Sequence, residues 1–289
     1  MKSHNIPSWL SAPLILGAFG FLIWLERRRP LRREVEPKVT RTARNLAVAG
    51  IGAVALQLTE RPVALELVAS IERHNLGLLK LLPLPLWLET ALAVALLDYT
   101  LYLWHVLTHK VPFLWRFHLA HHVDLDLDAS TALRFHFGEL ALSVPWRAAQ
   151  LIIIGVSPIA YSTWQLLLLL SILFHHSNIK LPISLERLLS LLIVTPRMHG
   201  IHHSIVREET NSNWSSGLSI WDRLHHTLRL NVPQDEIIIG VPAYQDPTDV
   251  DLASVVAMPF AKQRPSWKLP DDGESNRTPL PEPRNRLLA

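Results

Sequence analysis

Long uncharged apolar runs constrain this chain more than any other feature of its sequence. Trp9–Leu25 contains 17 residues without a charge, and Ala148–Phe174 contains 27. A helix needs roughly 17–25 mostly apolar residues to cross the bilayer core. Only 18% of the residues are charged, against about 25% in an ordinary soluble domain. These runs predict an integral membrane protein.

Breaks within the runs indicate how they divide into helices. Asn45–Ile71 is interrupted near Pro62, and a proline ends or kinks a helix. Leu81–Trp104 contains Asp98, and an ionisable group at such a depth usually faces the protein interior. Gly155 and the residues that follow it split the run at 148–174 into a hairpin of two short helices. Strand-like alternation is scarce, so we expect an all-α bundle of about four transmembrane or re-entrant helices.

Charge indicates the orientation of this bundle. Positions 26–44 hold eight basic and three acidic residues, and the positive-inside rule places such a loop in the cytoplasm. Two crossings after the loop return the chain to the cytoplasm at His105, and an out-and-back hairpin keeps both of its ends on one side. We therefore expect a cytoplasmic helical cap that carries the histidines.

Three regions follow from these patterns. Residues 1–80 would form N-terminal membrane helices and the basic loop, 81–232 the domain that carries the histidine-rich segments, and 233–289 a C-terminal extension. The 26 residues from Arg264 carry five prolines and nine charges. This composition predicts a solvated, disordered tail.

Histidine is the chemically informative residue here. The chain has no cysteine, which excludes disulfides, thiolate metal ligands and a cysteine nucleophile, whereas 13 of its 15 histidines lie between positions 105 and 226. Most of them are three or four residues apart, on one face of a helix if the segment is helical, and neutral imidazole binds iron, zinc, copper and nickel well. Ten such rings are too many for one ion and predict two. The ten candidate ligands are His105, His109, His118, His121, His122, His175, His176, His199, His202 and His203.

The ordered set of these histidine boxes resembles the fatty acid hydroxylase/sterol desaturase superfamily of membrane-bound di-iron oxygenases, and most of all its bacterial sterol desaturase-like branch. The similarity covers roughly residues 10–230. It rests on these segments: Asp98-Tyr-Thr-Leu-Tyr-Leu-Trp-His105-Val-Leu-Thr-His109, His118-Leu-Ala-His121-His122, Thr131-Ala-Leu-Arg134-Phe-His136, Phe174-His175-His176-Ser177-Asn178, His199-Gly-Ile-His202-His203, Asn211-Ser-Asn213-Trp214-Ser215 and Trp221-Asp222-Arg223-Leu224.

The resemblance implies an oxidoreductase with two iron ions that uses O₂ and external electrons to hydroxylate or desaturate a C–H bond of a lipid or sterol-like substrate. Zinc is expected as a possible substitute in purified protein. The electrons would come from a separate reductase, ferredoxin or cytochrome, because no fused redox module is visible; no nucleic-acid partner is expected. Five residues are expected around the ligands, most of them as hydrogen-bond partners of the ring nitrogens: Asp98, His136, Asn178, Asn213 and Asp222.

The chain departs from the family pattern at three places. The family commonly has Phe-Gly-Thr after its counterpart of Trp221-Asp222-Arg223-Leu224, whereas this chain has His225-His226-Thr227, so ligand status is not transferred to His225 or His226. The family often has a single histidine before Ser-Asn, which matches His176, but here His175 precedes it, so either could be the ligand. Tyrosine is usual where Trp214 stands.

Two other classes of function compete with the oxygenase. A membrane zinc hydrolase acting on a lipid would use a metal-bound water, but such enzymes usually carry a carboxylate beside the histidine motif, and neither His-x-x-His-His box contains one. A non-catalytic metal-binding or transport protein normally places its site near the bilayer midplane, whereas these histidines flank the apolar runs. The sequence leaves the substrate and the choice between hydroxylation and desaturation open.

Overall fold

The computed structural model describes residues 5–269 and 273–275, and its regular structure there is helical. The β structure among these residues is limited to isolated bridges. The all-α prediction is confirmed. The α-helices are α1 Ser8–Arg28, α2 Lys38–Leu58, α3 Glu60–His74, α4 Leu86–Lys110, α5 Pro112–His122, α6 Phe137–Leu142, α7 Val144–Ile154, α8 Pro158–His176, α9 Ile183–Leu189, α10 Pro196–His202, α11 Arg207–Thr210, α12 Ile220–Leu224 and α13 Leu252–Ala257. Short 3₁₀ turns cover Leu78–Leu81, Thr131–Leu133, Pro242–Tyr244, Pro247–Val250 and Met258–Phe260.

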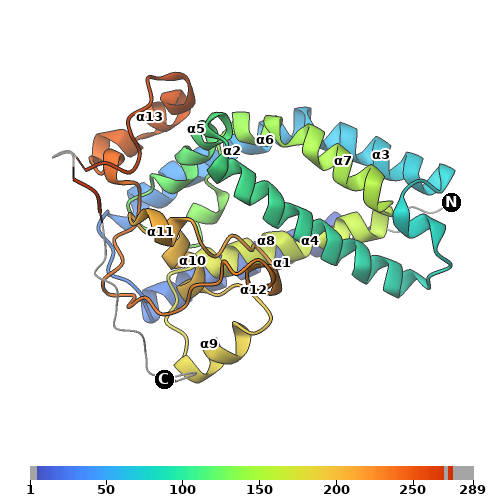
Figure 1. The fold of residues 1–289 in the computed structure, drawn as a ribbon, viewed down its shortest axis with the longest axis horizontal. Coiled ribbons are helices and arrows are strands. Elements are labelled where there is room, and N and C mark those ends of the chain that lie inside the picture. The colour runs from blue at the N-terminus through green and yellow to red at the C-terminus, as the bar shows by residue number, and fades with distance from the viewer. Residues whose placement is uncertain (1–4, 270–272, 276–289) are drawn as a thin grey trace.

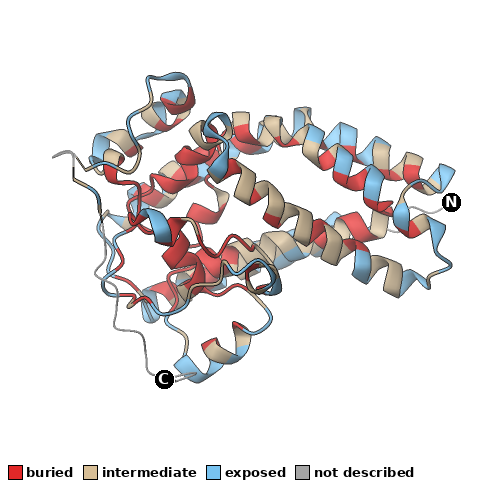
Figure 2. Cartoon of the chain, viewed as in Figure 1, coloured by how far each residue is buried: buried red, intermediate tan, exposed pale blue. Residues whose placement is uncertain are grey.

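The long helices form an elongated bundle, and the short helices gather at one end of it (Figure 1). α3 packs on α7, α4 packs on α8, and α1 covers α8 from outside. An apolar core that includes Ile71, Leu97, Leu151 and Trp164 joins α3, α4, α7 and α8. Figure 2 shows that buried residues concentrate at the end where α5, α10 and α11 meet. That end holds the polar residues discussed below.

Four helical segments are long and apolar enough to cross a membrane. They are α1, α4, the continuous pair α6–α7 (Phe137–Ile154) and α8. Only 6% of the apolar window of α1 is buried inside the protein, and Trp9, Phe21 and Trp24 are exposed on it. Such a surface needs an apolar surrounding, because a soluble protein rarely leaves a large apolar patch in water. The predicted count of about four membrane helices is confirmed.

The apolar region Asn45–Ile71 differs from the prediction of one interrupted span. It is shared by α2 and α3, which meet at Thr59, and neither helix is among the four that could cross a membrane alone. Pro62 lies in the first turn of α3, where its missing N–H breaks no intrahelical hydrogen bond. The helix break therefore comes before the proline.

Two glycines close the far end of the bundle. Gly155 ends α7 with a left-handed φ of 82°, and Gly77, with a φ of 95°, follows the end of α3. A Cβ on Gly77 would overlap the backbone of Gly155, so the two backbone segments approach this closely only because both residues lack a side chain. α8 begins after this turn, and its cap Ser157 accepts a hydrogen bond from the amide of Ala160. The run at 148–174 is thus divided at Gly155 between two helices, as the sequence predicts.

The basic loop lies at the same end of the bundle as the histidines. The amide of Leu31 donates to the carbonyl of Asn178, directly after α8. The amide of Asn178 in turn donates to the Glu26 carboxylate at 3.0 Å, at the end of α1. The loop between α1 and α2 is therefore fastened to the segment that follows His176.

The stretch at 264–269, for which the composition predicts a disordered tail, contacts other parts of the protein. Trp267 stacks on Trp115 of α5 with 5.7 Å between ring centroids, and the Trp115 Nε1–H donates to Ser266. Arg264 forms an ion pair with Asp249. Residues 264–269 thus contact the rest of the protein, and the disordered tail stays a prediction; positions 270–272 and 276–289 lie outside the described residues.

Candidate metal centre

Nine of the ten candidate ligands come together in two groups at this end of the bundle. They come from the last turns of α4 and α8, from α5, and from α10 with the residue that follows it. One potential ligand atom from each residue of a group lies within 4.8 Å of the others. The first group is His105, His109, His118, His122 and His202; the second group is His121, His176, His199 and His203.

Backbone and carboxylate acceptors orient the rings of the first group. The Nδ1 of His105 lies 2.7 Å from the Trp214 carbonyl, and the Nδ1 of His202 lies 2.8 Å from the Ser212 carbonyl. A carbonyl oxygen can only accept, so each Nδ1 carries the proton and each Nε2 keeps its lone pair. This is the tautomer that a metal ion bound at Nε2 requires.

Several ring nitrogens of the first group have no hydrogen-bond partner although they are buried. The Nε2 atoms of His109, His118, His122 and His202 are all of this kind. A buried polar atom left unpaired costs about 1–3 kcal/mol, so a cluster of four calls for a ligand. Nitrogen lone pairs grouped in this way fit a transition-metal ion.

The second group has a tighter arrangement of Nε2 atoms. The Nε2 of His176 lies 3.1 Å from that of His121 and 3.0 Å from that of His199. The Nε2 of His203 lies 3.1 Å from that of His199. The Nδ1 of His176 donates to the Ile172 carbonyl at 2.8 Å, which leaves its Nε2 without a proton. Four imidazole nitrogens this close together fit one ion held by all four.

Burial keeps five of the rings outside the membrane helices neutral. Burial, reinforced by neighbouring imidazoles, lowers the pKa of four of them well below the ordinary value: His121, His122, His199 and His203. Burial likewise lowers the pKa of His202 to about 3. A neutral ring offers the lone pair that a metal ion needs, because protonation would block it.

His175 is the candidate ligand that belongs to neither group. Its ring centroid lies 4.1 Å from that of His199 and 4.6 Å from that of His176, and its Nδ1 is buried without a partner. The structure therefore places His176, and not His175, with the grouped nitrogens. His175 lines the adjoining cavity.

The predicted hydrogen bonds from Asp98 and Asp222 to ring nitrogens are not found. Asp98 accepts from the amide of Leu218 at 2.9 Å and from the Trp221 indole at 2.7 Å. Asp222 accepts from the amides of Trp214 and Ser215. Both carboxylates accept hydrogen bonds from backbone amides of the loop before α12. They therefore hold this loop in place, and its Trp214 carbonyl orients His105.

Asn178, Asn213 and His136 also bond to groups other than the clustered rings. Asn178 exchanges two hydrogen bonds with the backbone of Arg32. Asn213 has a positive φ of 52° and donates to the carbonyls of Met198 and Arg229. His136 caps α6 by accepting from the amide of Gly138. These residues fix backbone segments, because a short polar side chain reaches nearby main-chain groups first.

Sequence reasoning missed the carboxylate that does contact a ring. Glu139, in the first turn of α6, lies 2.8 Å from the Nδ1 of His118. A carboxylate on the far nitrogen of a ligand fixes its tautomer and raises its basicity. In the sequence, Glu139 is visible only as an acidic residue three positions after His136, and no spacing rule connects it with His118.

We expect the substitution Glu139→Gln to lower the Fe²⁺ affinity of the first group about 10- to 100-fold. The amide keeps the shape of the side chain but removes the charge that strengthens His118 as a ligand. Anaerobic Fe²⁺ titration of the purified full chain measures this affinity. The matched control is Glu66→Gln, which changes an exposed side chain of α3. An unchanged affinity in Glu139→Gln would show that the contact does not tune the ring.

Gly200, inside the box that starts at His199, leaves room for the Arg32 side chain. The Arg32 guanidinium lies against Gly200 and donates to the Pro196 carbonyl and to Gln234. A Cβ at position 200 would overlap the guanidinium. The glycine thus lets the basic loop support α10 from behind its histidine face.

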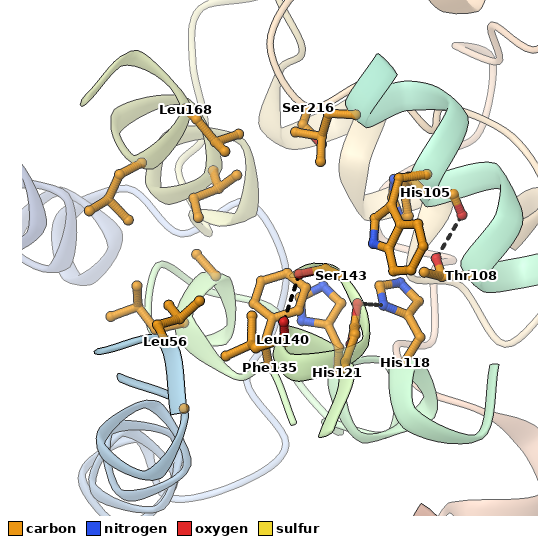
Figure 3. A pocket seen from close by; sticks show the side chains of 18 of the residues that line it. Leu56, His105, Thr108, His118, His121, Phe135, Leu140, Ser143, Leu168 and Ser216 are labelled. Atoms are coloured by element: carbon orange, nitrogen blue, oxygen red, sulfur yellow. Dashed lines mark hydrogen bonds and ion pairs between the residues drawn. The ribbon is translucent and has the colours of Figure 1, made fainter. Parts of the chain in front are cut away.

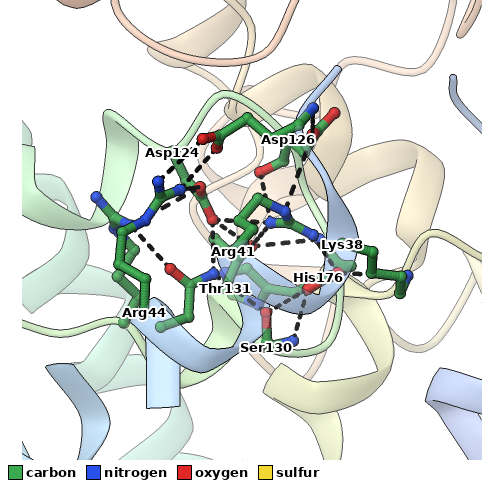
Figure 4. Close-up of polar contacts among 12 residues, drawn as sticks. Lys38, Arg41, Arg44, Asp124, Asp126, Ser130, Thr131 and His176 are labelled. Carbon is green, nitrogen blue, oxygen red and sulfur yellow. Dashed lines mark hydrogen bonds and ion pairs between the residues drawn. The ribbon is translucent and has the colours of Figure 1, made fainter. Parts of the chain in front are cut away.

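A buried charge network fastens the loop that follows α5 (Figure 4). Arg41 of α2, 1% exposed, pairs with Asp124 at 2.9 Å and with Asp128. Burial alone would raise the pKa of Asp124, but Arg41 and Arg134 lower it to about 2. The loop that begins two residues after His122 is therefore anchored by ion pairs to α2.

A cavity of about 560 Å³ leads away from the two groups. Figure 3 shows His105, His118 and His121 on one side of it and Leu56 and Leu168 on the other. Its wall is mostly apolar and comes from α2, α4, α6, α7 and α8. This volume suits a small lipid, since ligand pockets commonly measure about 300–1,000 Å³.

The fold and site define a helical protein of membrane type with a histidine-rich centre suited to two metal ions. Residues 90–227 match the family model described as "Fatty acid hydroxylase". This segment is just under half of the chain, and it is similar to the fatty acid hydroxylase family, so the predicted resemblance is confirmed.

The relatives act on different lipids by their names. The chain is 30% identical to an ornithine lipid hydroxylase of Rhizobium tropici over 62% of this chain and 50% of the relative. It is 26% identical to the Homo sapiens alkylglycerol monooxygenase, over 54% of this chain and 33% of the relative. It is 26% identical to the Mus musculus cholesterol 25-hydroxylase, over 48% of this chain and 46% of the relative. The chain thus spans half or less of the length of these relatives; no solved structure gives a significant match.

Proposed function

We propose that this chain is a membrane-bound, O₂-dependent di-iron oxygenase that hydroxylates a C–H bond of a lipid or sterol-like molecule. The observation that carries the proposal is the position of two closely spaced groups of histidines at one end of an apolar cavity. The family match and the hydroxylases and monooxygenases among the relatives support this reaction class. None of the relatives named above is a hydrolase or a transporter, so those alternatives gain no support.

The residues of the chain have distinct parts in this proposal. His105, His109, His118, His122 and His202 would hold one ion, and His121, His176, His199 and His203 the other. When bound, iron would supply the redox chemistry of O₂ that zinc, with its single oxidation state, lacks. The Trp214 and Ser212 carbonyls and Glu139 hold the rings in place before substrate arrives. The apolar wall excludes water and holds one C–H bond near the histidines, which is a positioning effect.

The location of the site follows from the loop beside it. Residues 26–44 have an excess of basic residues and lie at the histidine end of the bundle. By the positive-inside rule this end faces the cytoplasm. A separate reductase, ferredoxin or cytochrome in the cytoplasm would then supply the two electrons at this face.

The test is oxygen uptake by the full chain purified in detergent and loaded with Fe²⁺. With a chemical reductant and a membrane lipid extract, we expect oxygen uptake and a lipid product heavier by one oxygen atom in mass spectrometry. The matched control is the same protein loaded with Zn²⁺, which should consume no oxygen. Equal lipid profiles with and without iron would overturn the proposal.

A further inference from the structure

The cavity has a polar far end that the proposed reaction does not use. Arg147 and Glu60 line it there, with 3.5 Å between the Arg147 Nε and a Glu60 carboxylate oxygen. The Tyr161 hydroxyl donates to the same oxygen at 3.1 Å. Arg147 lies within a segment apolar enough to cross a membrane. Ionisable residues in such segments are rare and commonly mark the path of a substrate or ion.

One buried donor at this end, the indole Nε1–H of Trp164, has no hydrogen-bond partner. The Nε–H of Arg147 makes only the 3.5 Å ion-pair contact with Glu60 and no hydrogen bond; both side chains line the cavity. Trp164 is 3% exposed and Arg147 9%, and the guanidinium lies 4.3 Å from the Trp164 ring centroid. Buried donors are nearly always paired in folded proteins, so this end calls for an oxygen acceptor.

The charge at this end selects the kind of acceptor. The positive charge of Arg147 is balanced by Glu60, and these two are the charged side chains of the cavity wall at that end. An anion in a low-dielectric cavity needs net positive charge to offset the loss of water, and the pair supplies none. A hydroxyl group fits, because it accepts from Trp164 or Arg147 and can donate to Glu60.

The two ends of the cavity lie along one face of α8. Trp164, Gln165, Leu168, Leu169, Ile172 and His176 all line the cavity. Their spacing places them on one side of a helix, and the 12 helical steps from Trp164 to His176 cover about 18 Å along its axis. The stretch between the ends is apolar. It suits a hydrocarbon body whose polar group and reacting carbon lie at opposite ends.

We infer that the substrate is a neutral lipid with a hydroxyl group at the end remote from the oxidised carbon, and that Trp164, Arg147 and Glu60 bind this hydroxyl. The inference rests on the proposed function only in taking the cavity as the substrate site. It makes Trp164 and the Arg147–Glu60 pair determinants of specificity rather than catalytic residues. The carbon attacked is then set by its distance from the hydroxyl.

Binding measurements on the full chain without metal test this inference independently of turnover. Tritiated 1-hexadecanol is the probe, bound to purified protein in detergent, and hexadecane and hexadecyl sulfate are the competitors. We expect unlabelled 1-hexadecanol to compete at a concentration about tenfold lower than hexadecane or hexadecyl sulfate requires. This factor corresponds to the net contribution of one or two hydrogen bonds. Equal competition by hexadecane, or stronger competition by the sulfate, would overturn the inference.

The conservative substitution Trp164→Phe isolates the indole N–H, because it keeps an aromatic ring under the guanidinium. We expect it to reduce the preference for the alcohol over the alkane about three- to tenfold. Leu168→Ala is the matched control in the apolar stretch, and it should weaken both probes by a similar factor. A Trp164→Phe variant that keeps the full preference would contradict the assignment of the indole.

The double substitution Glu60→Gln with Arg147→Gln removes both charges together and avoids a single unpaired charge. We expect it to shift oxidation to other carbons of 1-hexadecanol in the iron-loaded protein and to lower the binding preference. If wild-type protein prefers the alcohol but consumes no oxygen, the hydroxyl site stands and the oxygenase proposal fails. If it oxidises lipids without any preference for the alcohol, the oxygenase stands and the hydroxyl site fails.

Discussion

The substitution His202→Ala is expected to reduce bound iron from about two ions per chain to about one, and oxygen-dependent turnover by more than a hundredfold. His202 lies within the first group and is held by the Ser212 carbonyl. Loss of an outer partner alone costs about 10- to 100-fold in metal affinity or activity, so loss of a ligand should cost more. Elemental analysis gives the iron content, and lipid-dependent oxygen uptake gives the turnover.

His203→Ala makes the same test of the second group, since His203 belongs to the other set although it is the next residue. Each variant should lose about one ion, and the pair together about two, if the groups bind independently. His225→Ala is the matched control, because His225 is exposed, contacts Tyr99 and lies outside both groups. Loss of both ions in either single variant would contradict separate sites. Normal iron in both variants would remove the metal assignment.

The candidate ligands were predictable from sequence because their spacing is local. His105 and His109, or His199 and His202, share a helix face whenever the segment is helical, whatever surrounds it. Their division into groups of five and four was not predictable. It depends on how α4, α5, α8 and α10 meet, so that neighbours such as His121 and His122 belong to different groups. The choice of His176 over His175 has the same cause.

The polar partners were the least predictable part of the site. Asp98 and Asp222 lie near the histidine boxes in the chain, but loop amides lie closer in space and take their hydrogen bonds. Glu139 contacts His118 only because the short helix α6 packs on α5. The membrane helices, in contrast, were predictable from composition. An apolar surface such as that of α1 faces lipid and does not depend on a contact with another part of the chain.

The hydroxyl end of the cavity belongs to the same class of unpredictable feature. Glu60 interrupts an apolar run, and Arg147 comes just before another, so in the sequence each marks only a boundary. Their pairing joins two helices that pack on each other, α3 and α7, at the wall of the cavity. A membrane protein tolerates such a pair where it is buried and useful, since each charge alone would be costly.

The substitution Arg41→Met is expected to lower the free energy of unfolding by about 3–5 kcal/mol, the usual cost of leaving a buried charge uncompensated. Arg41 is 1% exposed and pairs with Asp124 and Asp128, and its Nε lies 3.8 Å from Asp126. Burial alone would lower the pKa of Arg41, but the three aspartates raise it above the ordinary value, so the guanidinium stays charged. Thermal unfolding of the purified full chain in detergent measures the loss.

Two further variants separate the buried charges from a general effect of the basic loop. Arg33→Met removes an exposed charge from the same loop and should change stability by less than about 0.5 kcal/mol. Adding Asp124→Asn and Asp128→Asn to Arg41→Met removes the two carboxylates that have lost Arg41 as a partner, and should recover part of the stability. If Arg41→Met is as stable as Arg33→Met, the network does not hold the loop after His122. A loss that the added asparagines deepen would show that the carboxylates stabilise the fold without Arg41.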